Sequence, residues 1–282
     1  MEKSVHIAIT RMKTKRTIGY EKDKETEMKR HGKMLLLLVM LAATTLMILG
    51  NFTPAAAQNE MKTDEALKTV IIDRLSKHGL LTRDTIQVTV SSDTITLAGT
   101  VSTLADKNRA LSDVEDVGEG YTIIDNLIVR QSGAPDQEIA DKIVKELQGS
   151  IFYGIFDWVN VDVNNGVATL TGWAYDTWHR TLFVHLAEKV VGVTEVRNEI
   201  KILPLTPWND NIRRVAALLI YDNPDLNIFS RTISPPIHIL VIDDMEVYLE
   251  GYVSSKFQKN WIAMIVNGRA HPNKLINNLK VE

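Results

Sequence analysis

Hydrophobic and polar residues alternate between Val159 and Ala174 in the manner of a β-hairpin with one apolar face. The alternating apolar or small positions are Val159, Val161, Val163, Ala168, Leu170, Gly172 and Ala174. Asn165-Gly166 stands between the two halves, and this dipeptide tolerates the positive φ angles of a type I′ turn. The pattern therefore predicts two antiparallel strands joined by a two-residue turn.

The hairpin pattern occurs three times along the chain. Leu170 and Gly172 have counterparts 73 residues earlier and 79 residues later, which are Leu97, Gly99, Leu249 and Gly251. A second segment, 196–202, shares both offsets, because it aligns with 123–129 and with 275–281. Two landmarks with the same pair of offsets indicate three copies of one unit.

Each copy is predicted to run helix, strand, strand, helix, strand. The three repeats cover residues 61–131, 136–203 and 208–282. In the first, apolar residues at helical spacing follow Thr63 and Asp64, either of which is suited to cap a helix. We expect an α+β fold in which a three-stranded mixed sheet is covered on one face by two helices.

One glycine of each hairpin is expected to be structural. Gly99, Gly172 and Gly251 occupy the same position, on the side of the sheet that the helices cover. A glycine in a strand often marks a close approach of another element. We expect the missing side chain to let the second helix approach the sheet.

Residues 34–57 have the organisation of a secretory signal peptide. An apolar run from Met34 to Gly50 follows a basic segment and precedes Ala55-Ala56-Ala57, an A-x-A cleavage pattern. The alternative is an uncleaved membrane anchor, because the run is near the lower length limit for a spanning helix. Residues 1–33 form a charged N-terminal extension, in which Met28 is an alternative start.

The charge of the chain is distributed unevenly. Residues 1–57 hold 10 of the 32 Lys/Arg and 5 of the 35 Asp/Glu, so residues 58–282 carry a net charge of −8. This balance argues against a nucleic-acid binder or a polybasic membrane patch. The chain has no cysteine, which excludes disulfides and thiolate metal sites.

The repeat resembles the BON domain, a family named for bacterial osmotically inducible periplasmic proteins and nodulation proteins. The residues that carry the resemblance are the hairpin ends 96–101 and 169–174, the segment 192–198 and the closing 277–281. The resemblance implies a non-enzymatic, periplasmic envelope module. In several relatives such modules are tied to phospholipid or membrane-surface binding, or to the protection of periplasmic proteins.

Motifs of catalytic or metal-binding chemistry are absent from the sequence. The seven histidines include no pair at the i, i+4 spacing of a helical zinc site, and neither G-x-S-x-G nor a P-loop occurs. Asp243-Asp244 is interpreted as a solvated hairpin turn, with a calcium ligand pair as the alternative. His179 and His185 are interpreted as surface or capping residues rather than acid–base catalysts. We expect no enzyme activity, no cofactor and no metal site.

The second repeat adds aromatic residues that the first lacks. Relative to the first repeat, Gly79, Leu80, Arg83, Thr85, Thr100 and Ala105 are replaced by Phe152, Tyr153, Phe156, Trp158, Trp173 and Trp178. The hairpin register places Trp158 opposite Trp173 and Phe156 opposite Tyr175, all pointing away from the apolar face.

Two interpretations of these aromatic residues remain open. They form either an exposed strip that contacts a lipid interface or an envelope protein, or a seam that another repeat or a linker covers. The candidate contact residues are Phe152, Tyr153, Phe156, Trp158, Trp173 and Tyr175.

Three functions are consistent with the sequence. The first is an exported envelope protein that binds a membrane phospholipid surface or envelope components, with periplasmic localisation and membrane association. The second is a periplasmic chaperone-like stress protein that shields client proteins. The third is a scaffold of an envelope complex.

Overall fold

The computed structural model describes residues 55–224, 226 and 235–282, and of residues 55–62 it describes the backbone alone. The chain divides into Met1–Ala56 and Ala57–Glu282, and the described structure belongs almost entirely to the second part. The predicted extension at 1–33 and nearly all of the predicted signal segment at 34–57 lie outside the described residues. Within the described part, no helix has the length and apolar character needed to cross a membrane.

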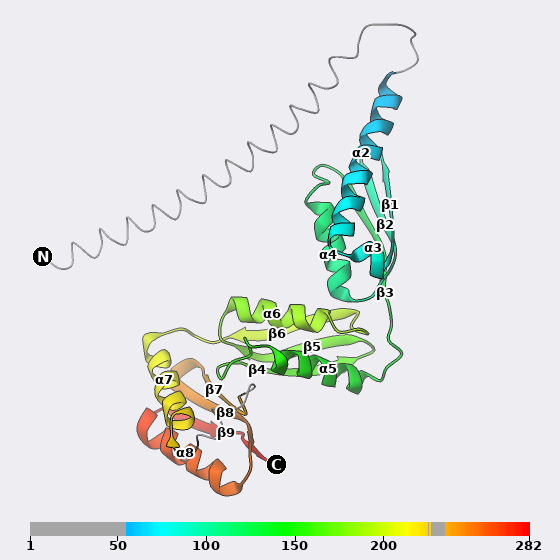
Figure 1. The fold of residues 1–282 in the computed structure, drawn as a ribbon. Coiled ribbons are helices and arrows are strands. Elements are labelled where there is room, and N and C mark those ends of the chain that lie inside the picture. The colour runs from blue at the N-terminus through cyan, green and yellow to red at the C-terminus, as the bar shows by residue number, and fades with distance from the viewer. Residues whose placement is uncertain (1–54, 225, 227–234) are drawn as a thin grey trace, which may run out of the picture. The chain divides into compact units, whose positions relative to one another are not determined.

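The first repeat has the expected order of elements (Figure 1). Its helices and strands are α2 (Ala55–Lys77), α3 (Leu80–Arg83), β1 (Thr85–Ser91), β2 (Thr94–Val101), α4 (Leu104–Glu115) and β3 (Thr122–Val129). The sheet order is β1-β2-β3, with β1 antiparallel and β3 parallel to the central β2.

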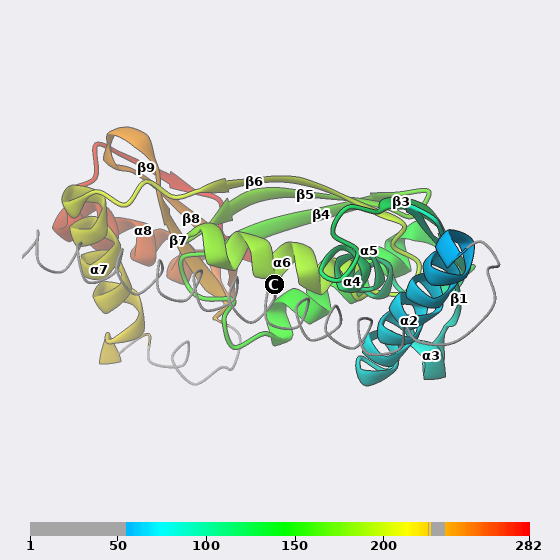
Figure 2. The same ribbon diagram turned by 90° about the horizontal axis from the view of Figure 1, so that it is seen from above.

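The second repeat repeats this arrangement. Its elements are α5 (Asp136–Gly149), β4 (Trp158–Asn164), β5 (Val167–Ala174), α6 (Thr177–Glu188) and β6 (Glu195–Ile202). Figure 2 shows β4, β5 and β6 side by side with β5 in the middle, as the pairing requires. Asn165 and Gly166 have φ of 50° and 76°, which confirms the predicted two-residue turn.

The third repeat follows the same order with an interrupted last strand. Its elements are α7 (Pro207–Tyr221), β7 (Ile237–Val241), the 3₁₀ turn η2 (Asp243–Met245), β8 (Glu246–Val253), α8 (Lys256–Ala270), β9 (Lys274–Asn277) and β10 (Lys280–Val281). Both β9 and β10 pair in parallel with β8, so together they take the place of one closing strand. Asp243 and Asp244 lie at the hairpin tip, as expected.

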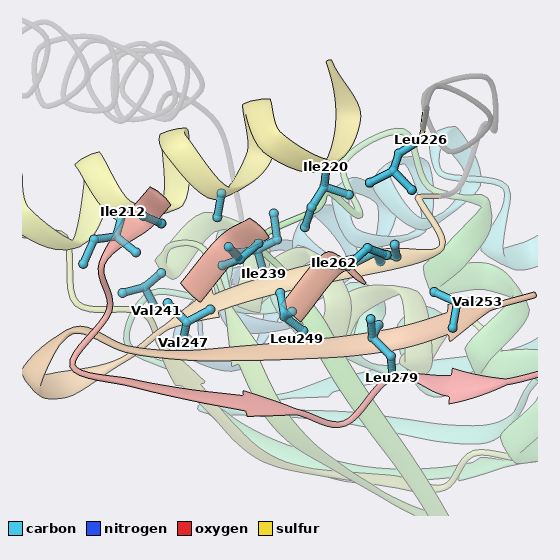
Figure 3. Close-up of a cluster of buried hydrophobic side chains, with 14 residues drawn as sticks. Ile212, Ile220, Leu226, Ile239, Val241, Val247, Leu249, Val253, Ile262 and Leu279 are labelled. Carbon is cyan, nitrogen blue, oxygen red and sulfur yellow. The ribbon is translucent and has the colours of Figure 1, made fainter. Parts of the chain in front are cut away.

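Each repeat has its own apolar core between the helices and one face of the sheet. Figure 3 shows the core of the third, in which Ile212 and Ile220 on α7 point toward Ile239, Val241 and Leu249 on the strands. All five side chains are at most 4% exposed. Burial of this kind is the main stabilising contribution in so small a unit. The α+β prediction of mixed three-stranded sheets packed with helices is confirmed.

Two side-chain-to-backbone hydrogen bonds recur at the same positions of all three repeats. The second helix is capped by Thr103, Asp176 or Ser255, whose side chain accepts from the backbone N–H three residues later. In the closing strand, the side-chain oxygens of Asp125, Asn198 and Asn277 accept from the backbone N–H two residues later. The offsets of 73 and 79 therefore hold for hydrogen bonds as well as for the apolar pattern.

The hairpin glycines are structural for a different reason from the one expected. Gly172 has a φ of 110°, and an added Cβ would lie 2.2 Å from the carbonyl oxygen of Trp158 on the neighbouring strand. At Gly99 and Gly251 the corresponding distances, to Thr85 O and Pro236 O, are 1.8 and 2.0 Å. The obstacle to a side chain is thus the adjacent strand backbone and the left-handed φ, and not an approaching helix.

The expected start of the first helix is also wrong. Helix α2 begins at Ala55 and passes through Thr63 and Asp64 without ending there. The Asp64 carboxylate instead accepts from the backbone N–H of Ser92 in the β1–β2 turn, at 2.9 Å. In the second repeat Asp136 holds the Asn165-Gly166 turn in the same way. A side chain that suits a helix cap also suits a tight turn, and the tertiary structure selects the turn.

Candidate functional site

Trp158 and Trp173 lie where the hairpin register predicts. They are direct cross-strand partners, and Lys201 on β6 continues the row on the other side of Trp173. The Lys201 Nζ lies 5.5 Å from the centre of the Trp173 ring, a cation–π contact. Both tryptophans are half-buried and occupy the sheet face that the helices of this repeat do not cover.

Phe156 and Tyr175 lie just beyond the ends of the paired strands. Their rings stack at 5.8 Å, so the predicted pairing of these two residues is present as a ring contact. Phe156 also packs against the apolar core of the third repeat. It thus belongs to a contact between repeats.

Tyr153 is buried, with 5% of its surface exposed. Its hydroxyl oxygen accepts from the Val159 N–H at 3.0 Å, and its ring contacts Phe183 and His238 at 5.4 and 5.3 Å. Burial raises the pKa of the Tyr153 phenol above its ordinary value. The side chain is part of the interior.

Strand β7 of the third repeat covers this part of the second repeat. The Ile239 N–H donates to Ile155 O at 2.7 Å, and His238 Nδ1 lies 3.1 Å from Gly154 O. The His238 ring is 5.1 Å from that of Trp158. All five residues of β7 are buried, although a strand with one open face would alternate. We call this contact, made by Tyr153–Trp158 and β7, the β7 seam.

His238 is a buried imidazole at the centre of the β7 seam. Only 3% of its surface is exposed, and burial lowers its pKa to about 4. A neutral imidazole is therefore part of the seam at neutral pH.

A buried aspartate, which the sequence analysis missed, fixes the start of each of the first two hairpins. The Asp157 carboxylate accepts from the N–H groups of Gly154 and Tyr175 at 2.9 and 2.7 Å, and burial raises its pKa. Its counterpart Asp84 accepts from the N–H and the hydroxyl of Ser102. The two aspartates are 73 residues apart, so the repeat offset could have identified them.

A groove of about 740 Å³ runs between α7 and the β7 seam. Its apolar lining includes Phe156, Tyr175 and Leu218, and the last is 50% exposed. The Arg213 side chain at its edge is 1% exposed and donates to Asp210 and to the carbonyls of Pro204 and Val241. Arg213 thereby ties the linker before α7 to the end of β7.

An exposed aromatic cluster lies on the second repeat, outside the seam. Phe152 and Trp178 are 45% and 54% exposed, and their rings meet edge to face at 4.8 Å. The neighbouring Ile151 is 82% exposed. We call these three residues the Phe152–Trp178 cluster. The sequence identified both aromatic residues as additions to this repeat but did not show that they meet.

The predicted contact residues therefore separate into two groups. Tyr153, Phe156 and Trp158 belong to the β7 seam, while Phe152 is exposed and Trp173 and Tyr175 are half-buried outside it. This arrangement favours the seam interpretation for most of the strip. Among the described residues, no group of three or more His, Asp or Glu side chains is placed to hold a metal ion.

The three units of like topology define a tandem-repeat α+β protein. The BON domain model matches residues 63–131 and 135–204, so the chain contains two BON domains. The third repeat lies outside these matches.

Two solved structures of CdsD, a structural protein of the type III secretion system of Chlamydia trachomatis, are similar to part of this chain. Both are 14% identical over 75% of it, cover 92% and 97% of their own chains, and have a TM-score of 0.21. That score is too low to support a conclusion about this chain. A comparison with curated protein sequences finds no match.

Proposed function

We propose that this protein is an exported, non-enzymatic envelope protein that docks on a phospholipid surface through the Phe152–Trp178 cluster. The observation that carries the proposal is the exposed aromatic pair itself, at positions where the first repeat has Gly79 and Ala105. The BON domains support the envelope assignment, because the family resemblance implies phospholipid or membrane-surface binding in several relatives. Periplasmic localisation belongs to the same proposal.

Aromatic side chains suit such a contact physically. Trp and Phe favour the membrane–water interface, where an apolar ring is buried and the surroundings stay polar. Because residues 58–282 carry a net charge of −8, overall charge cannot attract them to anionic lipid. Apolar contact must therefore supply much of the affinity of this site.

The third repeat is proposed to be a diverged BON domain. Its helix cap at Ser255, its side-chain hydrogen bond at Asn277 and its hairpin Gly251 match those of the other repeats. At the position of Asp84 and Asp157 it has Pro236, which gives it no equivalent of the buried carboxylate.

Vesicle flotation of the full chain tests the membrane proposal. We expect Phe152→Ser combined with Trp178→Ala to weaken binding about tenfold or more, since each exposed ring contributes on the order of 1 kcal/mol or more when it leaves water. Trp173→Thr, which takes the residue of the first repeat at Thr100, is the matched control and should bind normally. Unchanged binding by the double variant would show that the cluster is not the contact.

The groove beside α7 favours a second candidate, the shielding of client proteins. Phe156, Tyr175 and the exposed Leu218 give it an apolar lining suited to an unfolded segment. Leu218→Asp should then abolish the suppression of client aggregation and leave vesicle flotation intact. A variant that suppresses aggregation as well as the unsubstituted chain would exclude the groove.

A further inference from the structure

The second helices of the three repeats differ in the face that they turn to solvent. The helix caps align α4, α6 and α8, so that Ala105, Trp178 and Phe257 occupy one equivalent position. Ala105 is buried, whereas Trp178 and Phe257 are 54% and 72% exposed. The third repeat therefore also presents an aromatic side chain at this position.

Helix α8 extends this aromatic position into an apolar stripe. Phe257, Trp261 and Met264 follow one another at i, i+4 and i+7, which places them on one face of the helix. The rings of Phe257 and Trp261 are 5.8 Å apart, and Met264 is 63% exposed. The opposite face, with Ile262, Val266 and Ala270, fills the core of the third repeat. Trp261 is half-buried and also packs against that core, whereas Phe257 and Met264 are exposed.

The charge of α8 is opposite to that of the chain around it. The helix contains Lys256, Lys259 and Arg269 and no acidic residue, while residues 58–282 carry a net charge of −8. No ion pair among the described residues involves any of these three cations. By contrast α4, the equivalent helix of the first repeat, carries three acidic residues.

We infer that the outer face of α8 is a docking surface for an anionic phospholipid headgroup layer. An apolar stripe on a helix whose charged residues are all basic suits an amphipathic helix that lies in such a layer, the rings entering it and the cationic groups reaching phosphates. A second copy of the chain is a poorer occupant, because two α8 faces would bring six cations together without an acid. The inference adds to the proposed function a second site and the anionic class of lipid.

A probe on α8 tests this docking directly. The chain has no cysteine, so Met264→Cys in the full chain can carry an environment-sensitive nitrobenzoxadiazole label at one position. The matched control is Ser112→Cys at the equivalent position of α4, which is also exposed. We expect the fluorescence of the label at 264 to shift to shorter wavelength with vesicles that contain phosphatidylglycerol. Pure phosphatidylcholine vesicles, and the label at 112, should give no shift.

Removal of the two lysines then tests the charge. Lys256→Gln with Lys259→Gln should weaken binding to the anionic vesicles by about 25-fold, because each such lysine contributes roughly fivefold near an anionic surface. Phe257→Ala, which takes the residue of the first repeat, should reduce the spectral shift at 264.

The outcomes distinguish this inference from the proposed function. A shift at 264 that persists in the Phe152→Ser, Trp178→Ala background supports the α8 site whatever becomes of the other cluster. Vesicle binding without a shift at 264 overturns the α8 site and leaves the Phe152–Trp178 proposal standing. A concentration-dependent shift without vesicles would identify a second copy as the occupant, and absence of any vesicle binding overturns both.

Discussion

At the scale of the residue, the neighbouring backbone determines which amino acid a few positions can hold. Gly172 combines a φ of 110° with a carbonyl oxygen 2.2 Å from the place of its missing Cβ. Asp157 satisfies two backbone N–H groups with one carboxylate that is 1% exposed. Asp157 is buried and Gly172 has no side chain, so both residues act by fixing the backbone.

Gly172→Val should destabilise the second repeat more than Thr171→Val. A valine at 172 requires a left-handed φ and displaces the Trp158 carbonyl, which should cost about 1–3 kcal/mol or more. A valine at 171 suits strand geometry, and the wild-type threonine is half-buried on the outer face. Urea unfolding measures the difference, and equal midpoints for the two variants would contradict the argument.

At the scale of the element, β7 differs from the first strands of the other repeats. β1 and β4 each contain exposed positions, whereas every residue of β7 is buried. The reason is that its helix-facing residues enter the core of the third repeat while His238 meets Tyr153 and Trp158 of the second. The β7 seam therefore joins two repeats that have the same internal fold.

Trp158→Thr should loosen the β7 seam, while Trp173→Thr should not. Each substitution introduces the residue found at the equivalent position of the first repeat, Thr85 or Thr100. Only Trp158 contacts His238. We expect faster hydrogen exchange of the Ile239 amide, which donates to Ile155 O, in the Trp158 variant alone. Equal exchange in the two variants would show that the Trp158 ring contributes nothing to the contact.

The cap of α8 gives a second prediction at this scale. The Ser255 side chain accepts from the Gln258 N–H at 3.1 Å, so Ser255→Ala should cost about 1 kcal/mol of the stability of the third repeat. Ser254→Ala is the control, because that residue enters the capping arrangement through its backbone N–H. Thermal unfolding of both variants provides the measurement, and a Ser254 effect as large as that of Ser255 would refute the assignment.

At the scale of the whole molecule, the features of interest are the basic charge of α8 and the few exposed aromatic side chains. Among the described helices of more than four residues, α8 alone has only basic charged residues, and the exposed aromatic residues include Phe152, Trp178 and Phe257. Of the other aromatic residues that distinguish the second repeat, Tyr153 is buried and Phe156 and Trp158 are half-buried in the β7 seam. The surface left for a partner is thus smaller than the aromatic content of the sequence indicates.

Acidification should lower the free energy of unfolding through protonation of His238. The pKa of His238 is lowered from 6.5 in the unfolded chain to about 4 in the folded one. Its full contribution to the free energy of unfolding is therefore present above pH 6.5. The contribution is lost as the pH falls from 6.5 to about 4, and reaches about 3 kcal/mol. Burial raises the pKa of the nearby Asp157, which acts in the opposite direction, since its protonated form is favoured in the fold.

The contribution of His238 is isolated by comparison with His238→Gln. The difference in unfolding free energy between the two proteins should change between pH 6.5 and 4, because the Asp157 contribution is common to both. A difference that stays constant over this range would show that His238 is not buried in its neutral form.

The sequence by itself determined the repeat unit, the hairpin register and the placement of Trp158 opposite Trp173, because strand alternation and turn chemistry are local properties. Two fixed offsets extended that local pattern to the whole chain. The tertiary structure alone decided which aromatic residues are exposed, since Tyr153 lies in the core of its own repeat and Phe156 packs against the core of the third repeat, which is distant in the sequence. It also decided why Gly172 is glycine and that Asp64 holds a turn, because both depend on a backbone that another segment brings near.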